Sequence, residues 1–334
     1  MMFAVRRHGP VVLGLVLLGC GGAATPAPAE PDPSLEEPPA GPGPVAAASS
    51  PKVQQGVDAI QAQDFAKAKV LLSDARKVAP NDAQAAFYLG VALQNLGDAA
   101  AAEKEYQAAL ALDAALAEAS VNLSAMLLDD NAAERALPVI DKALAKAPKH
   151  PDLLLNRALA LESTGKSAEA VKAYGAAVEA RPANVELRLA YADMLLSSGQ
   201  SAPALAQVKQ AAETDDPKLL AAAAHLFGRL KAPAECIGAL DRALKPGPTA
   251  ELHTRRGVCR HEAGDDPGAK ADFESALKLD PNFAPAHFYL GMHLRATNKK
   301  SAVEHLKKAS ELSKGQGMGK AADEAIAELA KKKK

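Results

Sequence analysis

The sequence predicts an all-α fold, a solenoid of about eight helix pairs that ends in a capping helix. Three observations lead to this prediction. The chain is rich in alanine but poor in aromatic residues, which make up 4% of its 334 residues, and it contains no tryptophan. A pattern of small and bulky residues recurs about every 34 residues. Glycine and proline recur within that pattern where one helix is expected to give way to the next.

The bulk composition favours stacked helices and excludes some function classes. An alanine-rich chain with few aromatic side chains lacks the bulk for a wide globular core, whereas helices lined by small residues can pack closely together. The formal net charge of −1 provides no basic footprint for nucleic acid. Three cysteines are too few for a disulfide scaffold. The chain is therefore expected to bind no nucleic acid and to rely on helix packing for its stability.

Residues 1–19 have the features of a secretory signal peptide. A basic segment precedes the apolar run of residues 11–18, which is too short to cross a bilayer comfortably. The run ends in Leu17-Leu18-Gly19-Cys20, which resembles the bacterial lipobox. That resemblance implies that the signal peptide is removed before Cys20, and that this residue receives a diacylglyceryl group and an acyl chain such as palmitate. The alternatives are an uncleaved anchor helix and an ordinary signal peptide in which the cysteine is incidental.

Residues 20–51 are expected to form a disordered linker behind the lipidated cysteine. This segment is rich in proline and alanine and cannot bury enough apolar surface to order itself. Gly21 follows Cys20, and no aspartate occupies that position. By resemblance to enterobacterial sorting, this indicates a lipid-anchored protein of the bacterial envelope, in the outer membrane and facing the periplasm. The linker would let the folded part stand away from the lipid surface.

Eight repeats align along the rest of the chain. Each contains a small residue, at Gly56, Gly90, Ser124, Ala158, Ala192, Ala224, Gly257 and Gly291. A bulky residue follows sixteen positions later, or fifteen in the last repeat, at Leu72, Tyr106, Ile140, Tyr174, Val208, Leu240, Phe273 and Leu306. A small residue lies four positions before each bulky residue and an alanine lies three positions after it. This spacing places small, bulky and small side chains on one helical face, so that two helices can approach closely.

The repeat pattern resembles the tetratricopeptide repeat over about residues 49–312, with turns such as Leu96-Gly97-Asp98 between the two helices. The resemblance implies a right-handed α-solenoid in which each helix pair must stack on its neighbours. We assign residues 52–216 to repeats 1–5 and residues 217–312 to repeats 6–8. The final segment, residues 313–334, is assigned to a capping helix over residues 321–330 and a solvated lysine tail.

Two departures from the repeat pattern fall close together. The junction Thr214-Asp215-Asp216-Pro217 is two residues shorter than the others, and Lys231-Ala232-Pro233 replaces the glycine turn of the sixth repeat. We therefore expect the array to divide near residue 216 into an arm of five repeats and an arm of three.

No pattern indicates catalysis. The chain has no glycine-rich phosphate loop after a strand, no His-Glu-x-x-His and no Cys-x-x-Cys. Six histidines lie in the last three repeats, at His225, His253, His261, His287, His293 and His305. None has a second ligand four residues away on the same helix, so neither a metal site nor a cofactor is predicted. Cys236 and Cys259 should lie on stacked helices, and either a disulfide or two buried thiols remains open.

The family resemblance implies that the first helix of each pair lines a concave groove. Carried over to repeats 2–5, it assigns to this groove the apolar residues Phe87, Val91, Val121, Leu128, Leu155, Leu159, Leu189 and Leu196. The polar residues interleaved with them are Gln94, Glu118, Asp129, Asp152, Glu162, Glu186 and Asp193. An apolar floor with acidic edges favours an amphipathic helix or an extended apolar peptide with basic flanks. The alternative is that these side chains only pack against neighbouring helices.

These features together predict a non-catalytic protein–protein interaction scaffold. The expected partners are other envelope proteins, bound through the groove, and the membrane, reached through the lipid anchor; no small-molecule substrate is expected. The architecture is similar to that of the pilotins of type IV pilus secretins and of the repeat lipoproteins of gliding motility complexes. The alternative function is a docking module that recruits peptidoglycan enzymes.

Overall fold

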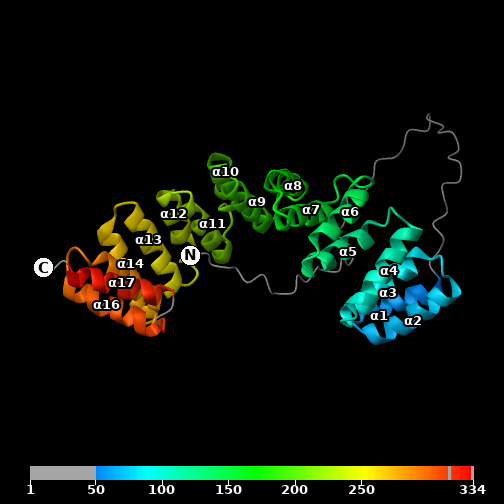
Figure 1. Ribbon diagram of the computed structural model, residues 1–334, viewed down its shortest axis with the longest axis horizontal. Helices are drawn as coiled ribbons and strands as arrows, with labels where there is room; N and C mark the ends of the chain where they lie inside the picture. The colour runs from blue at the N-terminus through cyan, green and yellow to red at the C-terminus, as the bar shows by residue number, and fades with distance from the viewer. Residues whose placement is uncertain (1–49, 315–316, 332–334) are drawn as a thin grey trace, which may run out of the picture. The chain divides into compact units, whose positions relative to one another are not determined.

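The structure, a computed structural model, describes residues 50–314 and 317–331, and every regular element in this part is an α-helix (Figure 1). The helices are α1 (Pro51–Gln61), α2 (Phe65–Val78), α3 (Ala83–Asn95), α4 (Ala99–Leu112), α5 (Ala117–Asp129), α6 (Ala133–Leu144), α7 (Pro151–Ser163), α8 (Ser167–Ala180), α9 (Val185–Ser197), α10 (Ser201–Ala211), α11 (Pro217–Arg229), α12 (Pro233–Ala243), α13 (Ala250–Glu262), α14 (Asp266–Leu279), α15 (Ala284–His293), α16 (Lys299–Leu312) and α17 (Met318–Lys331). Among them, none has the length and apolar character needed to cross a membrane. The signal peptide, Cys20, the linker up to residue 49 and residues 332–334 lie outside the described residues.

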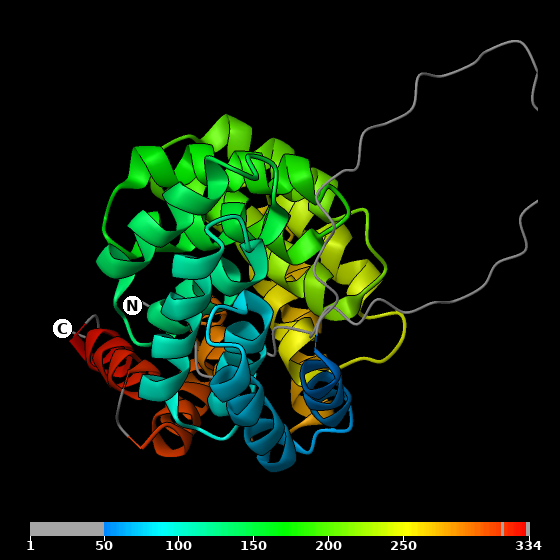
Figure 2. The same ribbon diagram turned by 90° about the vertical axis from the view of Figure 1, so that its right-hand side faces the viewer.

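Helices α1–α16 form eight consecutive pairs, and each pair packs on the next (Figures 1 and 2). The first helices of neighbouring repeats also touch, as α5 does α7 and α13 does α15. Helix α17 packs against α16 and α15 at the end of the array, with Ala322 and Leu329 buried. The predicted all-α repeat solenoid with a C-terminal capping helix is therefore confirmed.

In the four repeats whose small residue is glycine, that residue lies directly against the bulky residue of the paired helix. A Cβ atom added at Gly90 would lie 2.7 Å from ring atoms of Tyr106, and one added at Gly257 would lie 2.6 Å from the ring of Phe273. Tyr106 is 0% exposed and Phe273 is 2% exposed. The absence of a side chain on one helix thus makes room for a large side chain from the other, as the repeat pattern predicts.

Helix starts and turns follow from short polar side chains and backbone freedom. Asp98 caps α4 by accepting a hydrogen bond from the backbone N–H of Ala101, at 3.2 Å, and satisfies one of the donors that a helix start leaves open. Gly97 in the preceding turn has φ +81°, a conformation that glycine adopts without steric cost. In the sixth repeat Lys231 takes the equivalent conformation, with φ +54°. The turn therefore keeps its form although the glycine is missing.

Packing is continuous across residue 216, where the short junction suggested a division. Leu189 of α9 and Leu220 of α11 belong to one buried cluster, which extends to α12 and α13. Arg242 of α12 donates hydrogen bonds to the carbonyl oxygens of Ala212 and Thr214, and it forms an ion pair with Asp215 at 2.8 Å. Asp216 caps α11 by accepting from the backbone N–H of Lys218 at 2.7 Å. The junction is shorter than the others, but a shared apolar cluster and four polar contacts hold repeats 5 and 6 together across it.

Candidate functional site

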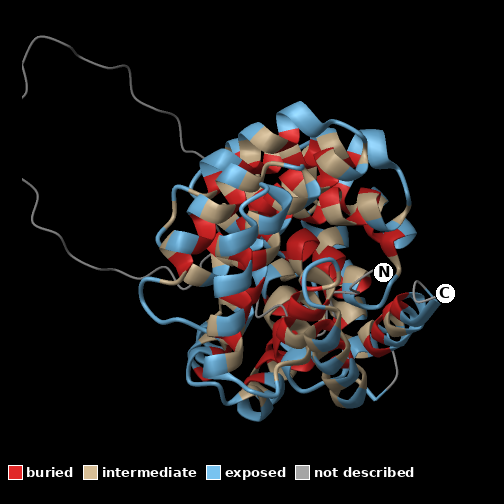
Figure 3. Ribbon diagram, turned by 90° about the vertical axis from the view of Figure 1, so that its left-hand side faces the viewer, coloured by how far each residue is buried: buried red, intermediate tan, exposed pale blue. Residues whose placement is uncertain are grey.

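Five of the apolar residues predicted for the groove are partly exposed on the first helices of repeats 2–5. They are Phe87 on α3, Leu128 on α5, Leu155 and Leu159 on α7, and Leu196 on α9. We call this set the apolar strip. Half-buried residues alternate with buried ones along the helices, as Figure 3 shows for the array from one end. Half-buried apolar side chains retain surface that a partner protein could cover.

The other three apolar residues predicted for the groove are buried among the helices. Val91 is 4% exposed, Val121 is 5% exposed and Leu189 is 7% exposed. The close approach of neighbouring first helices explains the burial of Val121: Asn156 of α7 donates hydrogen bonds to the carbonyl oxygen of Val121, at 3.2 Å, and to Ser124, at 2.9 Å. These three valine and leucine residues support helix packing rather than a partner surface.

Several polar residues predicted for the groove bind partners within the fold. Gln94 accepts a hydrogen bond from the Tyr106 hydroxyl at 2.6 Å, and Glu162 accepts one from the Tyr174 hydroxyl at 2.5 Å. Two of the acidic residues form ion pairs with arginines: Asp152 with Arg181, at 2.6 Å, and Asp193 with Arg229. Part of the predicted negative charge is therefore balanced within the chain.

Three acidic residues predicted for the groove are exposed on helices that also carry the apolar strip: Glu118 and Asp129 on α5 and Glu186 on α9. Desolvation raises the pKa of Asp129, and the charge of the neighbouring Asp130 raises it further. Exposed carboxylates on the helices that carry an apolar surface can attract cationic groups on a partner. This combination suits an apolar segment with basic flanks.

A pocket of about 380 Å³ lies between α4, α5 and α6. Its apolar lining includes Leu110, Leu123 and Leu127, and Arg135 and Lys142 contribute basic groups. The repeat pattern does not predict this pocket, because the pocket forms where the second helices of two successive repeats meet a first helix. An exposed proline within α6, Pro138, lines it and is the one local signal of an unusual packing position.

Cys236 of α12 and Cys259 of α13 form a disulfide, with their Cα atoms 6.1 Å apart. Both residues are buried, at 1% and 5% exposed. The bond joins the second helix of repeat 6 to the first helix of repeat 7. Of the two alternatives left open by the sequence, the structure contains the bridged one.

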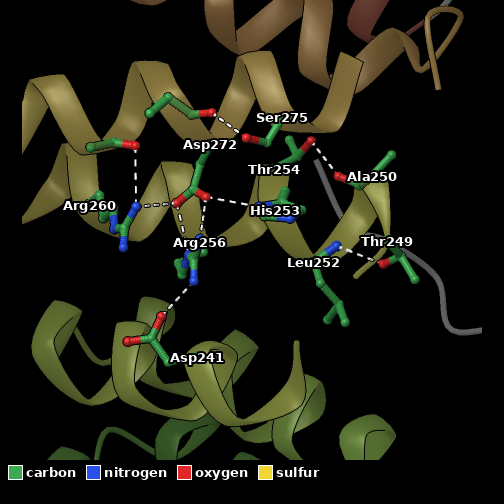
Figure 4. Close-up of polar contacts among 12 residues, drawn as sticks. Asp241, Thr249, Ala250, Leu252, His253, Thr254, Arg256, Arg260, Asp272 and Ser275 are labelled. Atoms are coloured by element: carbon green, nitrogen blue, oxygen red, sulfur yellow. Dashed lines mark hydrogen bonds and ion pairs between the residues drawn. The ribbon is translucent and has the colours of Figure 1, made fainter. Parts of the chain in front are cut away.

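A buried carboxylate forms a polar network in repeat 7 that the repeat pattern does not predict (Figure 4). Asp272 of α14 is 2% exposed and accepts hydrogen bonds from Arg256, at 2.6 and 2.9 Å, and from Arg260, at 2.9 Å. His253 Nδ1 lies 2.9 Å from the same carboxylate. Arg256 also forms an ion pair with Asp241 of α12 at 2.7 Å, which connects the network to repeat 6.

Burial alone would raise the pKa of Asp272. Hydrogen bonds from Arg256 and His253, together with the charges of Arg256 and Arg260, outweigh that effect and hold the pKa below its usual value. The carboxylate therefore stays ionised and engaged with basic groups of the fold, which favours a structural role. Its sequence signal is the spacing of His253, Arg256 and Arg260, which lie on one helical face where other first helices are apolar.

Comparison with known proteins supports the repeat assignment. The family model of the tetratricopeptide repeat matches residues 53–117, 92–151, 126–184 and 155–219. No curated protein matches the chain. A tetratricopeptide repeat protein from Parabacteroides merdae is 19% identical, covers 73% of this chain and 97% of its own, and superposes with a TM-score of 0.50.

Two further solved structures are similar over about half of the chain. MamA from Desulfovibrio magneticus is 22% identical, with 50% of this chain and 96% of that chain covered and a TM-score of 0.45. YrrB, a repeat protein described as having an unusual peptide-binding site, is 19% identical, with 55% and 97% covered and a TM-score of 0.42. At these identities the structural similarities concern the fold alone.

Proposed function

The chain belongs to the tetratricopeptide-repeat family, whose members are protein-interaction scaffolds, and from this premise we propose that it is a membrane-anchored scaffold of the bacterial envelope. It would help to assemble or hold a protein complex of the secretin and pilus type or of the motility type. The observation that carries this proposal is the apolar strip, since five half-buried apolar side chains on four successive first helices offer a surface of the kind that partner segments cover.

The chemistry of this surface favours one kind of partner segment. An amphipathic helix or an extended peptide could place apolar side chains against Leu155 and Leu159, in the middle of the strip. Basic residues at either end of the segment would face Glu118 and Glu186. The acidic residues already paired with arginines contribute less, because their charge is balanced.

The proposed anchor is the lipid on Cys20, with residues 21–49 as the connection to α1. Two or more acyl chains hold a protein on a membrane stably, whereas one gives only marginal binding. We place the protein at the outer membrane, facing the periplasm, on the lipobox-like motif and the glycine that follows it.

Photo-crosslinking in intact cells tests the partner surface. A crosslinking amino acid at Leu159 is expected to capture a defined envelope protein, because this half-buried position lies within the strip. The matched control is the same amino acid at Lys172, an exposed position on α8 in the same repeat, which should capture much less. Secretin or motility proteins among the products support the assembly role, whereas peptidoglycan hydrolases or synthases would replace it with enzyme docking. Equal amounts of the same crosslinked products at positions 159 and 172 would argue against the apolar strip as the partner surface.

A charge-reversal pair provides a second control for that experiment. Glu118→Lys with Glu186→Lys should reduce capture at position 159, because the basic flanks of the partner segment would then meet like charges. The two carboxylates lie in the first turns of α5 and α9. Glu134→Lys with Glu169→Lys makes the same change of charge in the first turns of α6 and α8. Both double variants lose the same favourable helix-dipole contacts. If the two double variants reduce capture to a similar extent, the carboxylates Glu118 and Glu186 do not contribute specifically to partner binding.

Thiol labelling tests the anchor and the disulfide together. Mature protein taken from membranes and denatured without reductant should show no reactive thiol, since the Cys20 sulfur would be a thioether and the other two cysteines are bonded. Reduction should then reveal two thiols, counted by mass after alkylation. One thiol before reduction would mean that Cys20 is unmodified. Two thiols that need no reduction would mean that Cys236 and Cys259 are free.

A further inference from the structure

Three side chains with metal-binding atoms converge at the boundary between repeats 7 and 8. His261 lies in the last turn of α13, Asp266 is the first residue of α14 and His293 is the last residue of α15. Asp266 Oδ1 lies 2.8 Å from His261 Nδ1 and 3.7 Å from His293 Nδ1. Their three ligand atoms all lie within 4.8 Å of one another. This convergence depends on the stacking of α15 on α13.

His293 supplies an independent indication that a ligand belongs here. Its side chain is 13% exposed, and its Nδ1 atom is buried without a hydrogen-bond partner. The ring packs edge-on against Phe273, at 6.3 Å between centroids, and against His261, at 5.6 Å. A buried polar atom without a partner is costly. A positive ion between the three residues would satisfy this nitrogen without moving the packed ring.

We propose that His261, Asp266 and His293 form a binding site for a divalent transition-metal ion, of which zinc is the best probe. Two imidazole nitrogens and one carboxylate oxygen are a ligand set that zinc and similar ions accept, whereas magnesium and calcium prefer oxygen ligands alone. The inference does not depend on the proposed partner surface.

The geometry fits a four-coordinate ion after a small adjustment. Zinc bonds of about 2.0–2.1 Å at tetrahedral angles place neighbouring ligand atoms about 3.3 Å apart. The distance from Asp266 to His293 is close to this value, whereas the distance from Asp266 to His261 must lengthen by about half an ångström. His261 and Asp266 have side chains 59% and 62% exposed, so they can shift and still leave room for water as the fourth ligand.

The charges around the site are compatible with a cation. Arg260, which precedes His261, donates to Asp272 and lies 3.8 Å from Asp265, so two carboxylates offset its charge. The ion would connect the helix pair α13–α14 to α15. Because it would bind only the folded arrangement, it would also stabilise repeats 7 and 8 against unfolding.

Isothermal titration of zinc into the full chain, purified without a polyhistidine tag and freed of metal with a chelator, tests the site. One saturable ion is expected, and His261→Ala and His293→Ala should each weaken its affinity by about tenfold or more. His261 is exposed, so its variant is expected to fold normally even where the His293 variant does not. His305→Ala is the matched control, because His305 pairs with His287 elsewhere in repeat 8, at 2.9 Å.

Binding of cobalt(II) gives a second measurement that does not depend on stability. Visible absorption typical of a tetrahedral ion should appear with the wild-type chain and be absent from the double variant of His261 and His293. The proposal is overturned if the wild type binds no saturable ion, if the double variant binds zinc as the wild type does, or if only His305→Ala weakens binding. The double variant retains Cys20 and the other histidines, so its signal measures the background.

Discussion

Replacement of Asp272 with alanine is expected to lower the free energy of unfolding of the C-terminal repeats by about 3 kcal/mol. The carboxylate is 2% exposed and accepts hydrogen bonds from two arginines, whose side chains are 16% and 24% exposed. Its removal leaves His253 without its carboxylate partner and leaves Arg256 and Arg260 with only the more exposed carboxylates of Asp241 and Asp265. The lower end of the range for buried ion pairs applies because the arginines keep some contact with water.

Urea unfolding followed by circular dichroism would measure this loss, and hydrogen exchange of α13 and α14 would localise it. Circular dichroism is preferred because the chain has no tryptophan. Asp241→Ala is the control: its carboxylate pairs with the same Arg256 but has a side chain 47% exposed, so a loss below about 1 kcal/mol is expected. If the two variants unfold alike, Asp272 does not organise the network.

The same network should contribute to acid sensitivity. Because the pKa of Asp272 is lower in the folded chain than in the unfolded one, its stabilisation is present above the ordinary carboxylate value of about 3.9 and is lost as the pH falls through the folded value. Acidification from about pH 5 to about pH 3 should therefore reduce the stability of the wild type more than that of Asp272→Ala. Parallel pH curves for the two proteins would contradict this assignment.

Tyr106→Ala is expected to cost about 3–5 kcal/mol, the largest effect of any single truncation in the N-terminal repeats. The ring is 0% exposed, fills the space beside Gly90, and its hydroxyl donates to Gln94 at 2.6 Å. Tyr106→Phe removes only the hydroxyl and should cost about 1 kcal/mol. Thermal unfolding followed by circular dichroism separates the ring from its hydrogen bond.

A second substitution tests whether Gly90 and Tyr106 share one space. Gly90→Leu alone should destabilise by about 1–3 kcal/mol or more, because its Cβ would lie 2.7 Å from the tyrosine ring. Combined with Tyr106→Ala, the same leucine should recover part of the lost stability by filling the cavity. Gly228→Leu on α11 is the control, since a Cβ there meets nothing within 4 Å. Additive losses in the double variant would contradict a shared space.

The sequence predicts the fold well because the pattern that specifies it is local and periodic. The spacing between Gly90 and Tyr106 alone indicates which faces of two successive helices meet, and the structure shows the same contact. The capping helix was placed correctly for the same reason, although it begins at Met318, three residues before the predicted start. Periodicity does not say how closely neighbouring first helices approach, so it cannot decide whether Val91, Val121 and Leu189 line a groove or pack against the neighbouring helices, as they do in the structure.

The polar clusters could not be predicted because their members converge only after stacking. His261 and Asp266 are five residues apart, and the third member, His293, comes from the next repeat. A search for ligands on one helix cannot find such a set. Likewise, the length of the junction near residue 216 does not reveal which side chains cross it: α9 and α11 share one buried cluster, and Arg242 of α12 donates to a carbonyl oxygen of the junction.

The disulfide of the sixth and seventh repeats also limits how the chain responds to mechanical load. Helix pairs joined mainly to their neighbours can be pulled apart one after another, and each released residue adds about 3.5 Å of contour length. The bond between Cys236 and Cys259 spans a sequence separation of 23 residues, so it withholds about 80 Å of extension from the stretched chain. In the oxidised protein, a stretching force would pass through the disulfide, and the residues between the two cysteines would not extend. After reduction of the bond, these residues could extend as well.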